Sequence, residues 1–113
     1  MSTSRITTHV LDAGTGRPAA DVAVELHARD GATWLPIAAE RTDADGRISH
    51  LGPDELPPGE YRLRFDTGAY FGARGVDTFY PEVVLTVRVA DDGRHVHAPL
   101  LLSPFAYSTY RGS

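Results

Sequence analysis

Histidine is the residue type in this 113-residue sequence best suited to acid–base chemistry, and two histidines lie in strand-like runs. Within 5–12 and 95–102, successive residues alternate between two faces with the period of a β-strand. If the more apolar set of each run faces the core, His9 and His97 both project from the outer surface. Because imidazole titrates near neutral pH, such a pair could provide a general base and a general acid.

The composition limits the other chemistry that the chain can perform. It contains no cysteine and no lysine, so all 11 basic residues are arginine. These absences exclude disulfides, thiolate nucleophiles, cysteine-ligated zinc, Schiff bases and the lysine of a phosphate-binding loop. The sequence also lacks the Gly-x-Ser-x-Gly motif, which disfavours a conventional serine triad. Serine, histidine, tyrosine, arginine and carboxylates remain as functional groups.

Two further motifs raise the question of a metal. His95 and His97 form a His-x-His pair that could chelate zinc, with His9, His50 or a carboxylate as additional ligands. The spacing does not place a third ligand, so the zinc site remains an alternative and we expect no metal and no cofactor. The Asp-Ala-Asp-Gly motif at 43–46 resembles the start of a calcium loop but lacks the later ligands and the flanking helices. We interpret it as a turn.

The elements that must position these residues are short β-rich runs, separated by turn clusters about every eight to twelve residues. The expected strands cover residues 5–12, 22–27, 33–41, 47–50, 60–65, 83–89, 95–102 and 106–111. A stretch at 66–75 is the one helical candidate. This pattern predicts an all-β sandwich of seven or eight strands with one short helix, folded as a single domain over residues 1–113.

Charge and hydropathy argue against several kinds of partner. The net charge is −4 and the arginines are scattered, so the sequence offers no basic stripe for nucleic acid. No apolar run approaches the ~20 residues of a membrane-spanning helix, and residues 1–5 lack the apolar segment of a secretory signal. We therefore expect a cytoplasmic protein without nucleic-acid or membrane partners.

The outer surface that carries the two histidines is itself partly apolar. Leu11 shares this surface with His9, and both Pro99 and Leu101 share it with His97. A strand that is apolar on both faces usually packs against something on both of them. We expect a second copy of the chain to pack here, with the functional site in the groove between subunits.

Three blocks of sequence together indicate a known family. They are Ile-Thr-Thr-His-Val-Leu-Asp at 6–12 with Gly-Arg-Pro-Ala at 16–19, Thr-Asp-Ala-Asp-Gly-Arg at 42–47, and His-Val-His-Ala-Pro-Leu-Leu-Leu-Ser-Pro at 95–104 with Tyr-Ser-Thr-Tyr-Arg-Gly-Ser at 107–113. With these blocks the chain resembles the 5-hydroxyisourate hydrolase branch of the transthyretin-like family. The final Tyr-Arg-Gly-Ser is the mark of that branch. The hormone-carrying transthyretins have a similar sandwich but lack the tetrapeptide and these histidines.

The chain departs from the family pattern at two places. Val96 and Ala98 flank His97 where the family commonly has an aromatic residue and a valine, and both belong to the core face. Phe105 and Ala106 stand where Tyr-Gly is usual. We expect the first departure to leave the chemistry unchanged and the second to adjust the local turn.

The resemblance implies an eight-stranded transthyretin-like sandwich that assembles as a homotetramer, a dimer of dimers, with active sites in the channel between the dimers. The catalytic residues that it implies are His9, Arg47, His97 and Ser113, the last through its hydroxyl or its carboxylate. The substrate-binding residues that it implies are Arg47, Tyr110, Arg111 and Gly112.

The implied reaction is the metal-free hydrolysis of 5-hydroxyisourate to 2-oxo-4-hydroxy-4-carboxy-5-ureidoimidazoline, the step after urate oxidation in purine degradation. A histidine would assist the attack of water on a ring carbonyl, and the sequence leaves open whether it is His9 or His97. Two alternatives come from other classes of protein. Residues 10–63 also resemble carboxypeptidase-regulatory-type sandwiches, which are structural or adhesive modules. A transthyretin-like carrier would bind an aromatic ligand without turning it over.

Overall fold

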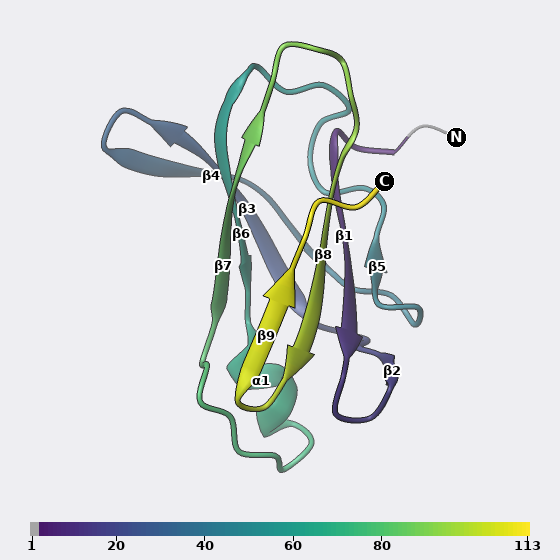
Figure 1. Cartoon of the computed structure of the whole chain (residues 1–113). Coiled ribbons are helices and arrows are strands. Elements are labelled where there is room, and N and C mark those ends of the chain that lie inside the picture. The colour runs from purple at the N-terminus through teal and green to yellow at the C-terminus, as the bar shows by residue number, and fades with distance from the viewer. Residues whose placement is uncertain (1–2) are drawn as a thin grey trace.

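The computed structural model describes residues 3–113 and consists of two β-sheets packed face to face, with one short helix at one end (Figure 1). One sheet has the strand order β2-β1-β8-β9, with β5 also paired to β1, and the other has the order β4-β3-β6-β7. The elements are β1 (Ile6–Asp12), β2 (Arg17–Pro18), β3 (Ala23–Asp30), β4 (Thr33–Arg41), β5 (Arg47–Ile48), β6 (Gly59–Phe65), α1 (Thr67–Gly72), β7 (Val83–Val89), β8 (Val96–Ser103) and β9 (Ala106–Thr109). None of the helices described is long and apolar enough to cross a membrane.

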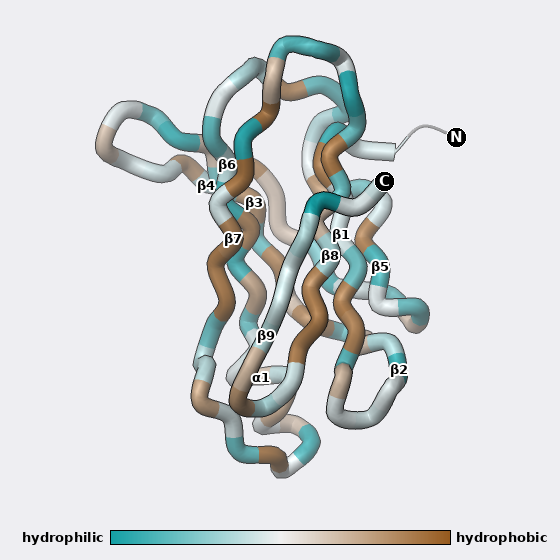
Figure 2. Tube along the Cα trace, viewed as in Figure 1, coloured by the Kyte–Doolittle hydropathy of each residue, from teal (hydrophilic) through white to brown (hydrophobic). Residues whose placement is uncertain are grey.

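The core lies between the two sheets and is filled by alternate residues of their strands. Val10 and Leu100 are fully buried from one sheet, and Leu26 and Leu63 from the other. Burying one such side chain stabilises the fold by about 1.5–3 kcal/mol. Figure 2 shows the same division, with hydrophobic positions concentrated along the strands and hydrophilic ones in the loops. The alternation confirms the predicted all-β sandwich.

The structure differs from the sequence-based prediction at several short elements. Arg17–Pro18 forms an unpredicted strand, β2, because two residues are too few to show any alternation. The expected strand at 47–50 is paired only over Arg47–Ile48. The expected helix at 66–75 is limited to Thr67–Gly72, and the Asp66 carboxylate caps its start.

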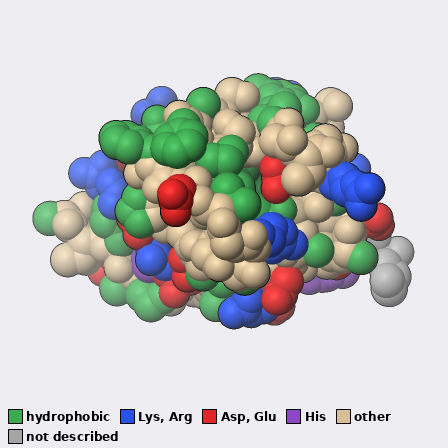
Figure 3. All heavy atoms as spheres, turned by 90° about the horizontal axis from the view of Figure 1, so that it is seen from below, with side chains coloured by type: hydrophobic (Ala, Val, Ile, Leu, Met, Phe, Trp, Pro, Cys, Tyr) green, Lys and Arg blue, Asp and Glu red, His purple; other side chains and the backbone are tan. Residues whose placement is uncertain are grey.

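The end of the sandwich near α1 carries exposed aromatic side chains. Phe79 and Phe105 are 71% and 68% exposed, and the Phe79 amide donates to the Pro104 carbonyl, which joins their two loops. Figure 3 views the molecule from below and shows hydrophobic side chains gathered on this end. Phe105 follows the end of β8, whereas His97 lies near the start of that strand, so the aromatic end is separate from the histidines.

Candidate active site

Strand pairing brings His9, Arg47 and His97 to one face of the first sheet. β1 lies between β5 and β8 (Figure 1), with His9 opposite Arg47 on β5 and Thr7 opposite His97 on the parallel strand β8. Paired residues point to the same face of a sheet, as do residues two apart on one strand. His9 and His97 are each half-buried, whereas Thr8 between Thr7 and His9 is buried in the core. The predicted orientation of the two histidines is therefore observed.

The Asp-Ala-Asp-Gly turn sets the position of Arg47, which follows it. The Asp43 carboxylate accepts hydrogen bonds from the backbone amides of Asp45, at 2.9 Å, and Arg47, at 3.0 Å. Gly46 has a φ of 75°, and a Cβ there would lie 2.3 Å from the carbonyl oxygen of Val10. Glycine is thus required at this position. The interpretation of the motif as a turn is confirmed.

The imidazole of His97 is held by a hydrogen bond that the sequence did not indicate. Its Nδ1 lies 2.8 Å from Thr7 Oγ1, and the same hydroxyl lies 2.8 Å from His95 Nε2. The two imidazole rings stack at a centroid distance of 6.4 Å. Nε2 of His97 therefore remains available for other chemistry, while Nδ1 is engaged with Thr7.

Burial of the His97 ring lowers its pKa below the ordinary value of 6.5, and the positive charge of Arg47 lowers it further, with smaller contributions from His95 and His9. A lowered pKa keeps the imidazole neutral near pH 7, which is the form that accepts a proton. Within residues 3–113, the Arg47 guanidinium has no ion-pair partner. Its donors are thus available to an anionic or carbonyl oxygen.

His9 makes a different contact. Its Nε2 lies 2.9 Å from the backbone carbonyl oxygen of Asp45. Because a carbonyl can only accept, Nε2 of His9 carries the proton of this hydrogen bond. The contact orients the His9 ring toward the turn that precedes Arg47.

The tail of the chain packs directly on His97. The Gly112 amide donates to the His97 carbonyl at 2.8 Å, and a Cβ at Gly112 would lie 2.5 Å from Cδ2 of the His97 ring. A side chain at this position would therefore collide with the imidazole. Arg111 donates through Nη2 to the carbonyl oxygen of His95 at 3.3 Å, which holds the tail along the start of β8.

A small cavity of about 200 Å³ brings Arg47, His97 and Ser113 together. Thr7 and His95 also line it, and neither is among the site residues predicted from the sequence. Strand alternation does place Thr7 on the same face as His9, so it could have been predicted. The sequence indicates His95 only as one half of a possible zinc-binding pair.

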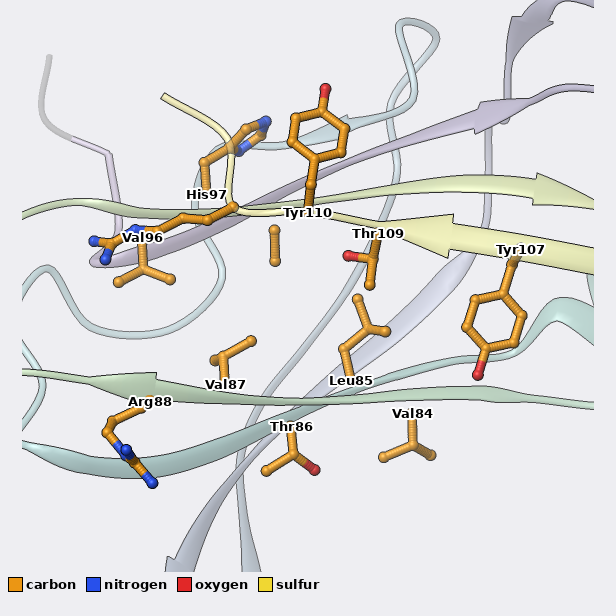
Figure 4. A pocket seen from close by; sticks show the side chains of 12 residues that line it. Val84, Leu85, Thr86, Val87, Arg88, Val96, His97, Tyr107, Thr109 and Tyr110 are labelled. Carbon is orange, nitrogen blue, oxygen red and sulfur yellow. The ribbon is translucent and has the colours of Figure 1, made fainter.

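A larger cavity of about 420 Å³ lies between β7 and the pair β8–β9, and Tyr110, Arg111 and His97 contribute to its lining. Figure 4 shows the side chains of His97 and Tyr110 on the same side of β8 and β9, pointing away from β7. His97 is thus shared by both cavities, and the structure does not bring Tyr110 and Arg111 into the smaller one. His9 and Gly112 line neither cavity.

The histidine pair does not form part of a larger ligand cluster. In the stretch from residue 3 to residue 113, no three side chains of His, Cys, Asp or Glu are grouped closely enough to hold a metal ion. His95 Nε2 and His97 Nδ1 instead share the Thr7 hydroxyl. The zinc alternative thus lacks a third ligand from the described part of this chain.

A comparison with protein-family models matches residues 6–112 to a family described as the HIUase/Transthyretin family. The chain belongs to this family. A family member from Salmonella typhimurium, named 5-hydroxyisourate hydrolase, is 43% identical over 96% of this chain and 80% of its own length.

Solved structures of the family include proteins of two kinds. The structure of Klebsiella pneumoniae 5-hydroxyisourate hydrolase is similar with a TM-score of 0.85 and 38% identity, covering 96% of this chain and 98% of that one. Sea bream transthyretin in complex with thyroxine is similar with a TM-score of 0.91 and 34% identity, covering 96% of this chain and 94% of that one. The transthyretin-like sandwich is thereby confirmed. Because the backbone matches both kinds, the site residues must distinguish the two functions.

Proposed function

We propose that this chain catalyses the hydrolysis of 5-hydroxyisourate to 2-oxo-4-hydroxy-4-carboxy-5-ureidoimidazoline, a step of urate degradation. The observation that carries the proposal is the half-buried imidazole of His97, which has a lowered pKa and shares a cavity with Arg47 and Ser113. Hydrolysis of a cyclic amide calls for a general base, donors for the oxyanion and an acid for the leaving nitrogen. The names of the Salmonella and Klebsiella relatives support this substrate.

His97 acts as the general base in the proposed mechanism. Its Nε2, the nitrogen that does not contact Thr7, accepts a proton from water as the water oxygen attacks a ring carbonyl carbon. The C–N bond to that carbon then breaks, and the His97 imidazolium returns the proton to the leaving nitrogen. The net change is the addition of one water across the bond, and no step of the proposed mechanism is assigned to a metal or a cofactor.

Arg47 stabilises the oxygen that becomes negative when water adds to the carbonyl. Its guanidinium presents planar donors and lacks an ion-pair partner within residues 3–113. Tyr110, Arg111 and Gly112 bind the edges of the substrate, and Ser113 completes the site from the tail. These roles follow the family resemblance.

His9 supports the site as a second imidazole. Its Nε2–H donates to the Asp45 carbonyl, so this nitrogen cannot accept a proton from water, whereas Nε2 of His97 makes no contact with Thr7 and can. His9 then positions water or stabilises the developing charge beside Arg47, which it faces across the β1–β5 pair.

The functional form in this proposal is a homotetramer, a dimer of dimers, with the site at the interface between the dimers. The half-buried side chains of Leu11 and Leu101 support it, because they lie on the same outer face as His9 and His97. Covering this face would remove water from the cavity and strengthen the contacts of Arg47 with the substrate.

A carrier function is the second candidate. The similarity to sea bream transthyretin, at a TM-score of 0.91, and the cavity of about 420 Å³ beside β7 both favour it. A carrier would bind an aromatic ligand and leave it unchanged, and it would not depend on the ionisation of His97.

An ultraviolet assay separates the two functions. Urate oxidase generates 5-hydroxyisourate from urate in place, and its decay is followed with the protein, chelator and a blank without protein. We expect faster decay with the protein and a loss of about 10²- to 10⁴-fold in the His97→Gln variant, the range typical of a positioned acid–base group. His27→Gln, in the second sheet, is the matched control and should keep full activity. Decay at the rate of the blank would favour the carrier, and full activity in His97→Gln would reject this base.

A further inference from the structure

The hydroxyl of Thr7 bridges two imidazoles, and it has one proton to donate. Its Oγ1 lies 2.8 Å from His95 Nε2 and 2.8 Å from His97 Nδ1. If it donates to one ring, it must accept from the other, so the two hydrogen bonds have linked directions. The tautomer of His97 therefore depends on whether His95 Nε2 accepts a hydrogen bond from Thr7 or donates one to it.

We propose that His95 is a positioning residue for the reaction: by accepting the Thr7 hydroxyl proton, it fixes the His97 proton on Nδ1 and leaves Nε2 of His97 free. The proposal rests on the function proposed above, in which Nε2 of His97 takes a proton from water. His95 itself does not touch the reacting atoms in this scheme.

Only one of the two hydrogen-bond arrangements allows His97 to act as a base through Nε2. When His95 Nε2 accepts from Thr7, Thr7 must accept from Nδ1–H of His97, and the lone pair of neutral His97 is on Nε2. When His95 Nε2 carries a proton and donates to Thr7, the hydroxyl donates to Nδ1 of His97. The proton of neutral His97 then lies on Nε2, so this nitrogen cannot accept a proton from the attacking water.

Thr7 and His97 lie in paired strands of the sheet, whereas His95 directly precedes β8 and is exposed. Thr7 is 6% exposed and stands opposite His97 in the β1–β8 register, so water competes little for its hydroxyl. His95 and His97 are two residues apart, and their rings are nearly parallel, with an angle of 19° between the planes. The Arg111 guanidinium binds the His95 carbonyl, which holds the backbone at this point.

Protonation of His95 should consequently switch off the base. A proton on His95 Nε2 reverses both hydrogen bonds of Thr7. The bridge is surrounded by His9 on β1, Arg47 on β5, and Arg111 and Ser113 in the tail.

The test combines the tautomer of His97 with the kinetics of two pairs of variants. Histidine ¹⁵N NMR distinguishes Nδ1–H from Nε2–H without any need for activity. His95→Leu removes the acceptor, whereas His95→Gln offers an amide oxygen to Thr7. Thr7→Val removes the hydroxyl at constant shape, whereas Thr7→Ser keeps it. His27→Gln is the control for loss of a histidine elsewhere.

We expect Nδ1–H on His97 in the wild type, His95→Gln and Thr7→Ser. In His95→Leu and Thr7→Val that preference should be lost, and kcat should fall by about 2- to 10-fold with KM little changed, the effect expected for one hydrogen bond. His95→Gln and Thr7→Ser should keep kcat near the wild-type value. A simple packing role of His95 would not predict this result.

Two outcomes would overturn the inference. One is Nε2–H on His97 in the wild type at a pH where the enzyme is active. The other is an unchanged His97 tautomer and kcat in both His95→Leu and Thr7→Val. A protein that fails to hydrolyse 5-hydroxyisourate but shows the expected tautomers would reject the proposed function and keep the Thr7 linkage. If His95→Leu does not fold, Thr7→Val decides by the same NMR signal.

Discussion

The chemical state of His97 is set by contacts from residues distant in the sequence. Thr7 engages Nδ1, Gly112 lies against the ring, and Arg47 adds a positive charge nearby. The side chain is half-buried, so each of these contacts acts in a medium less polar than water.

The pH dependence of activity should report the lowered pKa of His97. Protonation removes the base, so kcat/KM should be constant at neutral pH and fall as the pH drops through a midpoint below 6.5. Arg47→Met should move this midpoint upward, because the guanidinium charge contributes to the low pKa of His97. The substitution should also lower the rate. Arg41→Met, on the far sheet, is the control. A wild-type midpoint above 6.5 would contradict the assignment.

Gly112→Ala should damage activity more than stability. Its Cβ would lie 2.5 Å from Cδ2 of His97, so the imidazole must move, and a misplaced base costs about 10- to 100-fold in rate. Thermal unfolding should change little, since the tail lies on the surface of the sheet. Gly72→Ala is the matched control, because outside its chain neighbours and the backbone of its own helix no described atom lies within 4 Å of the added methyl group. Equal losses of activity in both variants would show that the His97 contact is irrelevant.

At the scale of the element, three strands and one turn hold the site. β1 supplies Thr7 and His9, β8 supplies His97, and the turn before β5 delivers Arg47. β1 is also anchored to the helix: the buried Asp12 carboxylate at its end accepts from the Tyr70 hydroxyl on α1 at 2.8 Å. The strand that supplies Thr7 and His9 is thus also held by a contact at its opposite end.

Tyr70→Phe should destabilise the fold by about 1–3 kcal/mol, because it removes one donor from a buried carboxylate. Burial and the bond to Asp12 raise the pKa of Tyr70 to about 12, so its hydroxyl remains a donor through the range of the experiment. Urea denaturation measures the free energy of unfolding. Tyr107→Phe, at a 39% exposed tyrosine, is the control and should change it by less than about 0.5 kcal/mol. Identical losses in the two variants would argue against a special role for the Asp12 bond.

At the scale of the whole molecule, the outer face of the first sheet is the surface on which the proposed tetramer depends. It carries His9 and His97 together with the half-buried Leu11 and Leu101. The other sheet leaves exposed leucine and isoleucine on β4, at Leu35 and Ile37, but no predicted site residue lies there.

Leu101→Glu should separate the subunits, because a carboxylate would be buried without a partner in the proposed interface. Light scattering after gel filtration should give a mass below four times the 12.2 kDa protomer, and activity should fall with it. The circular dichroism of a β-sandwich should be retained, since Leu101 is only half-buried in the protomer. Leu35→Glu, at a 48% exposed position, should leave the mass and activity unchanged. A wild-type protein of protomer mass would reject the tetramer.

Most of the strands, and the face on which their residues lie, could be predicted from the sequence. Alternation with a period of two is a local property, so the outward orientation of His9 and His97 could be predicted without knowing any partner strand. The turn before Arg47 was also local, since its aspartates and glycine bond within the motif. The roles of the seven predicted site positions remain predictions.

Which of these residues meet depends on the tertiary structure. The parallel pairing of β1 with β8 joins segments about 90 positions apart, as in the Thr7–His97 bond, and no local pattern encodes that register. It also placed Tyr110 and Arg111 in a cavity separate from that of Arg47, and it linked His95 to His97 through one hydroxyl. Strand partners are chosen by the packing of the whole core, because a slip of one residue would turn every buried side chain outward.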